Sequence, residues 1–255
     1  MPKAKIHGVD IYYEVQGDGE TIVLLHHGMG CTGIWEKLIP GFKKKYRTIT
    51  YDRRGFGKSD PGENFRDYYI NDRYCQQSVQ ELTGLLDHLQ VSGRVHVIGQ
   101  CEGGAIGFHF ATCHPDRIKT ITASSTLCYS QVTMQELCEI QLCAFEEEEP
   151  EFREKVIAWH GATRGPELYN LMLQLGGSYG SGVFDLRDLL KRVQCPALVL
   201  YPDRSSLFDV EQGIWMYRML PKGELAVLPN CGHNTYEQQP EDYQRIILSF
   251  LARHP

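Results

Sequence analysis

The stretch VIGQCEGGA, residues 97–105, decides the fold of this 255-residue chain. A β-rich apolar run enters it and an apolar pattern with helical spacing leaves it, which predicts a strand, a tight turn and a helix. Gly99 and Gly103 flank Cys101 at the spacing of a nucleophile elbow, in which small residues let the backbone turn so sharply that the middle side chain stands exposed. Small residues between a strand and a helix also serve close packing alone, so the rest of the chain has to support this interpretation.

Strands and helices alternate on both sides of this stretch. Two runs around His7-Gly8 alternate apolar and polar residues, which predicts an antiparallel hairpin at one edge of a sheet. Residues 21–25 then form a continuous apolar run, the pattern of a strand buried on both faces. The expected strands are 3–7, 9–16, 21–25, 46–51, 94–98, 118–123, 195–201 and 225–228, and the expected helices are 35–42, 72–89, 102–114, 209–220 and 240–252. This order predicts a mostly parallel sheet with helices on both faces.

Residues 125–192 break the alternation, because three or four helical patterns follow one another there with no convincing strand between them. We therefore expect an α/β core of residues 1–124 and 193–255 and a helical cap of residues 125–192. The Gly-rich run 176–182 has the composition of a flexible connection, and a hinge there would open a pocket. The simplest interpretation of the acidic run Glu146–Glu149 is a solvated helix end. The alternative is a site for a cationic ligand.

The composition excludes several classes of protein. The chain has 26 basic and 32 acidic residues, a formal net charge of −6, and no basic patch of the kind that binds nucleic acid. No apolar run approaches the roughly 18 residues that a membrane span needs, and the residues before the first expected strand are too few and too polar for a signal peptide. We expect a soluble, cytoplasmic protein without nucleic-acid or membrane partners; whether it forms a homo-oligomer is left open.

Nine cysteines are many for this length, but their number is odd and their spacing irregular, which argues against a disulfide framework. No Cys-x-x-Cys pair occurs and the histidines do not cluster with cysteines at zinc spacing, so no structural metal is expected. Several cysteines, such as Cys113 and Cys138, fall on predicted apolar faces. We expect most of these thiols to act as small buried hydrophobes.

Side chains able to do chemistry follow several of the predicted strands. His27, Asp52, Cys101, residues 201–205 and His233 all come at or just after strand ends. In an open parallel sheet, ligands bind outside the carboxyl ends of the strands. This common location supports the interpretation of Cys101 as an exposed reactive side chain.

Four motifs, in this order and spacing, resemble the α/β-hydrolases. They are HGMG at 27–30, DRRGFGKS at 52–59, GQCEG at 99–103 and CGH at 231–233. The resemblance spans the chain outside the cap and is strongest to the branch with a helical cap, which includes meta-cleavage product hydrolases, small esterases and cofactor-free haloperoxidases. It implies an eight-stranded, mostly parallel sheet flanked by helices, and it implies that no cofactor or metal is needed.

The resemblance also implies roles for individual residues. Cys101 would be the nucleophile at a helix N-terminus, where the helix dipole and free amides favour a thiolate. His233 would be the general base, and the backbone amides of Met29 and Glu102 would stabilise the oxyanion. His27 would brace its turn, and the loop that starts at Asp52 would be fixed rather than catalytic.

The chain departs from the family at the third member of the triad. The family usually reads Gly-Asp-x-Asp after the strand equivalent to 197–201, whereas Ser205 occupies the acid position here and Asp203 matches the earlier aspartate, which normally holds the loop. A backbone shift could still swing Asp203 inward. A serine nucleophile needs the carboxylate to stabilise the imidazolium. A low-pKa cysteine can already be a thiolate paired with an imidazolium, so a hydroxyl or carbonyl would then suffice to orient His233.

These residues favour a hydrolase that cleaves an ester, lactone or thioester bond of a small-molecule acyl substrate through an intermediate on Cys101. A cysteine elbow also resembles dienelactone hydrolases and polyhydroxyalkanoate synthases. The alternatives are an acyltransferase that uses the same thioester and a non-catalytic receptor that has lost the triad acid. A further alternative is that Cys101 was introduced by mutation into a serine enzyme. Aromatic and apolar residues of 125–192 are numerous enough to roof a pocket over Cys101.

Overall fold

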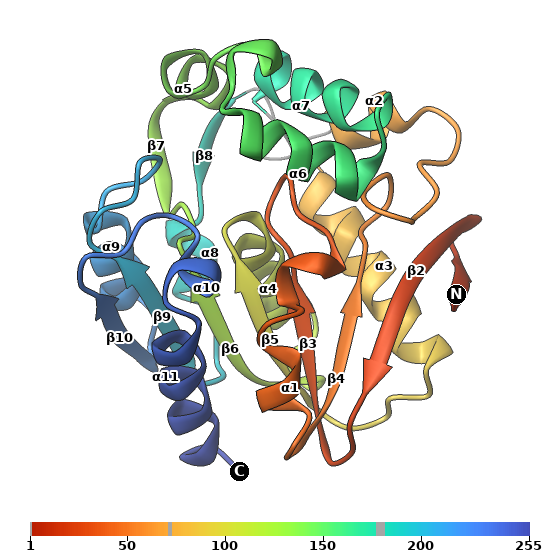
Figure 1. The fold of residues 1–255 in the computed structure, drawn as a ribbon. Helices are drawn as coiled ribbons and strands as arrows, with labels where there is room; N and C mark the ends of the chain where they lie inside the picture. Colours follow the sequence, from red (N-terminus) through yellow and green to blue (C-terminus); the bar gives the residue numbers. More distant parts are fainter. Residues whose placement is uncertain (1, 71–72, 177–181) are drawn as a thin grey trace.

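The computed structural model describes residues 2–70, 73–176 and 182–255. Eight strands form one sheet in the order β1-β2-β4-β3-β5-β6-β9-β10, and only β1 and β2 run antiparallel to their neighbours (Figure 1). The strands are β1 (Lys3–Ile6), β2 (Val9–Gln16), β3 (Glu20–Leu25), β4 (Tyr46–Tyr51), β5 (Val95–Gln100), β6 (Ile118–Ser124), β9 (Ala197–Pro202) and β10 (Gly223–Leu228). The predicted edge hairpin and mostly parallel sheet are confirmed.

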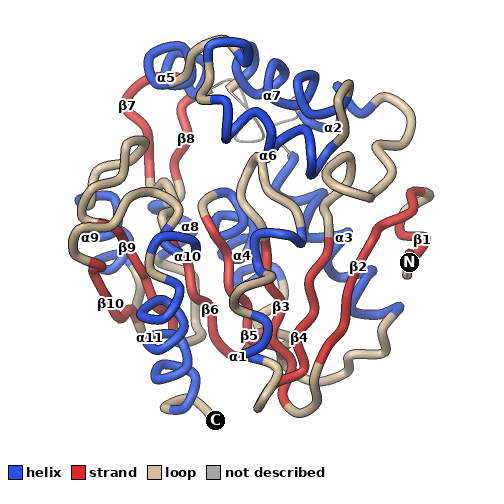
Figure 2. Tube along the Cα trace, viewed as in Figure 1, coloured by secondary structure: helices blue, strands red, loops and turns tan. Residues whose placement is uncertain are grey.

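Helices cover both faces of this sheet, because alternate residues of each central strand point to opposite faces. Val23 and Val97 belong to the hydrophobic cluster that includes residues of α3, α4 and α9, whereas Leu24 and Ile98 belong to the cluster with α1 and α11. The core helices are the 3-10 helix η1 (Thr32–Trp35), α1 (Ile39–Phe42), α2 (Phe65–Tyr69), α3 (Tyr74–His88), α4 (Glu102–Cys113), α8 (Arg187–Leu190), α9 (Glu211–Met219), α10 (Thr235–Gln238) and α11 (Pro240–Ala252). Figure 2 shows the strands between these two helical layers.

The segment between β6 and β9 contains the helices that lie above the carboxyl ends of the strands in Figure 1. They are α5 (Met134–Gln141), the 3-10 helix η2 (Phe145–Glu147), α6 (Pro150–His160) and α7 (Arg164–Leu175). Thr133 starts α5 with a capping box, in which its hydroxyl accepts the amide of Glu136 and Glu136 accepts the amide of Thr133. We call the part from α5 to α7 the cap.

The expectation that residues 125–192 contain no strand is wrong. β7 (Tyr129–Thr133) and β8 (Val183–Asp185) pair as an antiparallel ribbon that connects the core with the cap helices. These strands have five and three residues, which is too short for an alternating pattern to stand out in the sequence. The Gly-rich run 176–182, predicted as a hinge, lies largely outside the described residues.

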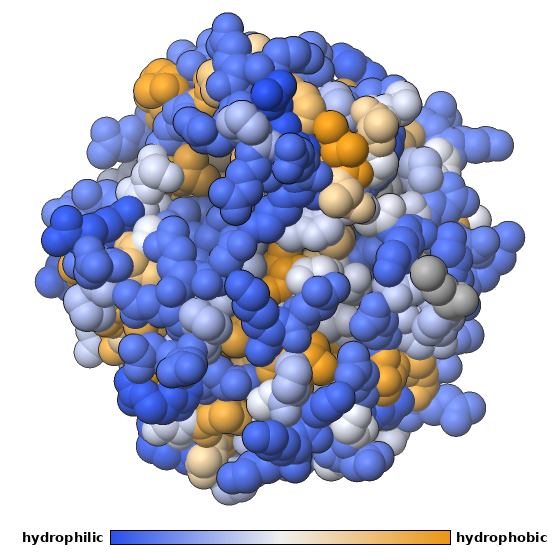
Figure 3. All heavy atoms as spheres, viewed as in Figure 1, coloured by the Kyte–Doolittle hydropathy of each residue, from blue (hydrophilic) through white to orange (hydrophobic). Residues whose placement is uncertain are grey.

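Other predictions differ from the structure in detail. The expected helix 35–42 is η1 followed by the single turn α1, and α2 was not anticipated. The predicted start of the helix at Asp72 lies outside the described residues, and α3 is described from Tyr74. All nine cysteines are free, but Cys113 is exposed instead of buried. The face of the molecule in Figure 3 is mostly hydrophilic with scattered apolar side chains.

Candidate active site

Cys101 lies on the tight turn between β5 and α4. Its φ of +52° and ψ of −115° are a conformation that a residue with a side chain rarely adopts, so the surrounding contacts must hold it. The Cys101 amide donates to the carbonyl of Ser124 at 2.7 Å, and the hydroxyl of Thr126 donates to the Cys101 carbonyl at 2.9 Å. These bonds tie the turn to β6 and leave the thiol in the wall of a cavity.

The two glycines that flank Cys101 are required by close approach of the backbone. A Cβ on Gly103 would lie 2.2 Å from the carbonyl oxygen of Leu25, and one on Gly99 would lie 2.4 Å from the backbone of Gly103. No real Cβ contact is that short, so both positions exclude a side chain. This is the steric reason for the Gly-x-Cys-x-Gly spacing.

His233 follows β10 and is fixed through its backbone from two other strands. Its carbonyl accepts hydrogen bonds from the Gln100 side chain at 2.9 Å and from the Ser125 hydroxyl at 2.7 Å. The imidazole packs edge-on against Phe208, with ring centroids 5.5 Å apart. Burial lowers the pKa of His233 to about 4. At neutral pH the ring is therefore uncharged, which opposes the imidazolium half of the expected thiolate–imidazolium pair.

Ser205 is the side chain that meets His233, with 3.1 Å between its Oγ and Nδ1 of the imidazole. The same Oγ accepts the backbone amides of Leu207 at 3.2 Å and Phe208 at 3.1 Å. A hydroxyl has two acceptor lone pairs and one proton, so these amides occupy both lone pairs and Ser205 must donate to Nδ1. This network assigns the proton of neutral His233 to Nε2. A triad aspartate would accept from Nδ1–H and leave Nε2 unprotonated.

Asp203 makes its contacts within the loops instead. Its Oδ1 accepts the amide of Cys231 at 3.1 Å, and backbone hydrogen bonds from Asn230 and Cys231 hold the pKa of the carboxyl below its usual value. The Arg204 guanidinium lies 3.9 Å from Oδ2. In this structure Asp203 therefore joins the loop after β9 to the loop after β10, while Ser205 contacts the imidazole.

The turn of the predicted oxyanion site is held by two histidines. The Met29 amide donates to Nδ1 of His27 at 3.2 Å, and the Met29 carbonyl accepts from Nε2 of His160 in the cap at 3.1 Å. His27 thus braces its own turn, as expected. The Met29 amide would have to leave His27 to meet an oxyanion. Glu102 opens α4, where the first amides have no acceptor within the helix.

A buried ion pair between Arg53 and Glu102 lies next to the turn at Cys101 and was not predicted from the sequence. Arg53 is fully buried, and it donates to Oε2 of Glu102 at 2.7 Å and to the carbonyl of His27 at 2.9 Å. The Glu102 side chain is only 1% exposed, so both members of the pair are buried. This pairing could not be predicted from the sequence, because Arg53 and Glu102 are far apart in the chain and approach each other only in the folded protein. Asp52 fixes its loop, as expected, by accepting the amides of Thr32 and Lys58.

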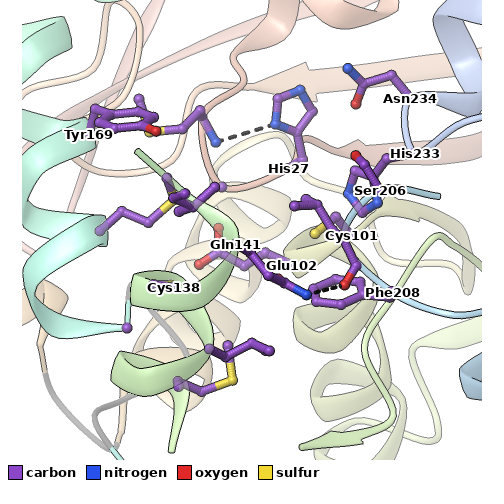
Figure 4. Close-up of a pocket in the computed structure, with 18 of the residues that line it drawn as sticks. His27, Cys101, Glu102, Cys138, Gln141, Tyr169, Ser206, Phe208, His233 and Asn234 are labelled. Atoms are coloured by element: carbon purple, nitrogen blue, oxygen red, sulfur yellow. Dashed lines mark hydrogen bonds between the residues drawn. The ribbon is translucent and has the colours of Figure 1, made fainter. Parts of the chain in front are cut away.

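A cavity of about 350 Å³ joins Cys101 and His233 to the cap. Figure 4 shows Cys101 and His233 on its core side and Cys138 and Tyr169 on cap helices α5 and α7. Its wall is formed by side chains from both parts of the chain: His27, Met29, Tyr69, Cys101, Glu102, Met134, Leu137, Cys138, Gln141, Leu142, Glu148, Phe152, Tyr169, Met172, Ser206, Leu207, Phe208, His233 and Asn234. The cap thus supplies the predicted roof.

Residues 20–176 match the family model described as alpha/beta hydrolase fold. The chain belongs to the α/β-hydrolase fold family. It is 24% identical over 267 residues to the 2-hydroxy-6-oxo-6-(2'-aminophenyl)hexa-2,4-dienoic acid hydrolase of Metapseudomonas resinovorans, with 96% of this chain and 89% of that enzyme covered. Two solved structures share the fold. A thermophilic esterase from Thermogutta terrifontis has 23% identity, full coverage of both chains and a TM-score of 0.78. The enol-lactonase from Burkholderia xenovorans LB400 has 19% identity, coverage of 98% and 100%, and a TM-score of 0.77.

No group of three or more His, Cys, Asp or Glu side chains among residues 2–70, 73–176 and 182–255 could hold a metal ion. None of the helices described is long and apolar enough to cross a bilayer.

Proposed function

We propose that this α/β-hydrolase cleaves an ester, lactone or thioester bond of a small-molecule acyl substrate, with Cys101 as the nucleophile. One observation carries the proposal. The thiol is held on a strained turn, with φ of +52°, in the wall of a cavity that His233 also lines. Backbone strain that surrounding contacts maintain is concentrated at functional sites, and a packing cysteine needs none.

In the first step the Cys101 sulfur attacks the carbonyl carbon, and the bond to the leaving oxygen or sulfur breaks to give a thioester on Cys101. The thiol proton passes to the leaving group through His233. For Nε2 to take that proton, the imidazole must first carry its own proton on Nδ1 and donate it to Ser205. Ser205 can accept only by giving up one of the amides of Leu207 and Phe208. Water then attacks the thioester carbon while His233 takes one of its protons. The carbon–sulfur bond breaks to release the acid, and His233 returns the proton to the Cys101 sulfur.

A second candidate, acyl transfer, is favoured by the same hydrogen-bond network. Because the resting imidazole keeps its proton on Nε2, it is a poor base for activating water, and a thioester on Cys101 would be long-lived. An amine or thiol acceptor is a better nucleophile than water and would then compete for the acyl group. The third alternative, a receptor without catalysis, predicts no acyl chemistry at all.

Hydrolysis of p-nitrophenyl acetate tests this proposal. We expect Cys101→Ala to lower kcat/KM by at least about 100-fold, because the nucleophile is lost. Cys113→Ala is the matched control, since Cys113 is exposed and lies outside the cavity, and it should keep the wild-type rate. Adding an amine separates the two catalytic alternatives, because hydrolysis yields acetate and transfer yields the amide. If neither product forms although Cys101 reacts normally with a thiol label, both catalytic alternatives are wrong and the protein is a receptor without catalysis.

A further inference from the structure

The wall of the cavity contains no positive charge at neutral pH. None of its residues is Lys or Arg, and residues 71–72 and 177–181, which the structure does not describe, include neither. Its two histidines are neutral, because burial lowers the pKa of His27 to about 3 and that of His233 to about 4. Arg53 lies behind Glu102 with its charge taken up by that carboxylate. An anionic substrate would therefore find no cationic side chain in the described wall of this cavity.

Glu148 places a carboxylate in the same wall without a cation to neutralise it. It follows η2 and is only partly buried, and none of the ion pairs in the described part of the chain includes it. The Tyr169 hydroxyl donates to it and so fixes its position. The rings of Phe152 and Tyr169 line the cavity beside it, with centroids 6.0 Å apart. A carboxylate next to aromatic rings is the environment that stabilises an ammonium group.

Glu102 contributes the second carboxylate of the wall. Oε1 of Glu102 is buried and has no hydrogen-bond partner, although Oε2 of the same carboxylate binds Arg53. Burial also closes this oxygen off from the cavity, so Glu102 contributes negative charge to the wall but no acceptor that a ligand can reach. Because Arg53 offsets the charge of Glu102, the wall carries one carboxylate, that of Glu148, in excess.

We propose that the cavity selects acyl substrates that carry an ammonium group and rejects those that carry a carboxylate, with Glu148 as the residue that sets this preference. The inference rests on the proposed function, since the selected substrate is the one that reaches Cys101. It separates this chain from the Metapseudomonas enzyme, which is named for a dienoic acid. The expected discrimination comes from the net charge of the wall.

The Cys101 thiol itself can report this charge without any acyl chemistry. Three methanethiosulfonates of similar size carry a 2-aminoethyl cation, a neutral 2-hydroxyethyl group or a 2-sulfonatoethyl anion. Each forms a mixed disulfide with a cysteine thiolate and releases methanesulfinate. Peptide mass mapping at pH 7 gives the labelling rate at Cys101 and, as an internal reference, at the exposed Cys113.

We expect the ratio of cation to anion labelling at Cys101 to exceed that at Cys113 by about tenfold. Glu148→Gln should lower the Cys101 ratio at least about threefold, because it removes the charge but keeps an oxygen that accepts from Tyr169. Glu147→Gln is the matched control, since Glu147 is exposed and lies outside the cavity wall, and it should leave the ratio unchanged. An unchanged rate with the neutral reagent shows that the variants keep the site intact.

Equal charge ratios at Cys101 and Cys113, or a Glu148→Gln ratio equal to that of the wild type, would overturn the inference. This outcome is distinct from failure of the proposed function. Charge selectivity without turnover of acetate esters contradicts the hydrolase alone, and turnover without charge selectivity contradicts the role of Glu148 alone.

Discussion

At the scale of single residues, the site differs from a serine triad in the direction of one hydrogen bond. A carboxylate accepts from the imidazole, whereas Ser205, with both lone pairs occupied by the amides of Leu207 and Phe208, donates to it. The pKa of His233 is correspondingly low, about 4, because burial disfavours the imidazolium and no carboxylate offsets it. Ser205 is in this account a positioning residue that sets the tautomer of His233.

Ser205→Asp should reverse this bond and raise the rate of acyl-enzyme hydrolysis. The new carboxylate accepts from Nδ1–H, frees Nε2 as a base and raises the pKa of His233 above its present value of about 4. Because the base is active only when neutral, the acidic limb of the kcat/KM pH profile should move to higher pH. Ser205→Ala, which adds no charge, should leave that limb in place. A limb that does not move in Ser205→Asp would contradict the assigned role of Ser205.

The identities of residues 101 and 205 should also be coupled. Cys101→Ser should abolish hydrolysis, because a hydroxyl needs a base with a free Nε2 and a stabilised imidazolium. Adding Ser205→Asp to Cys101→Ser should restore activity by about tenfold or more, since it completes a serine triad. Steady-state kinetics of both single variants and the double variant measure this coupling. Strictly additive effects would show that the two positions act independently.

At the scale of elements, the turn between β5 and α4 was predictable and its surroundings were not. Apolar periodicity and the Gly99 and Gly103 spacing predicted strand, turn and helix. The contact of Gly103 with the Leu25 carbonyl of β3 could not be predicted, because it joins segments far apart in the sequence. The hydrogen bond from His160 to the Met29 carbonyl could not be predicted either, because it depends on where α6 packs against the core.

Gly103→Ala should destabilise the fold by at least about 2 kcal/mol, because its Cβ would lie 2.2 Å from the backbone oxygen of Leu25. Urea unfolding at pH 7 measures the change in the free energy of unfolding. Gly93→Ala is the control, since a Cβ there meets no heavy atom within 4 Å, and its stability should stay near that of the wild type. Equal stabilities of the two variants would refute the close approach of β3 and α4.

At the scale of the whole molecule, the fold class was confirmed, and the sequence also located the chemistry at one edge of the sheet. Strand order in a parallel α/β sheet follows general rules, which is why the carboxyl-end location of Cys101 and His233 could be expected. The cavity could not, because it forms only where the cap meets the core. Ser205 was recognised at the acid position, but its donor role depends on loop amides that no sequence pattern encodes.

Stability of the whole chain should also depend on Glu81, a buried residue outside the site. Burial raises its pKa from 4.5 to about 7, and Tyr68 donates to it at 2.9 Å. Between these values the folded state holds the Glu81 proton and the unfolded state releases it, so the free energy of unfolding falls as pH rises through this range. Glu81→Gln mimics the protonated form. The variant does not lose this contribution as pH rises. The difference between its free energy of unfolding and that of the wild type should therefore increase by about 3 kcal/mol from pH 5 to pH 8.

Urea unfolding at both pH values checks this prediction, with Glu63→Gln as the control because Glu63 is exposed. A stability difference between Glu81→Gln and the wild type that does not change with pH would show that Glu81 ionises as freely when folded as when unfolded.

The central claim is that Cys101 carries the acyl group, and mass spectrometry of the quenched reaction tests it most directly. The protein is mixed with excess p-nitrophenyl acetate, quenched in acid after short times, weighed intact and digested for peptide mapping. The account predicts one acetyl group on Cys101 that disappears as substrate is exhausted, and faster loss of that group in Ser205→Asp. An unmodified Cys101 throughout turnover, or an acetyl group only on other residues, would contradict it.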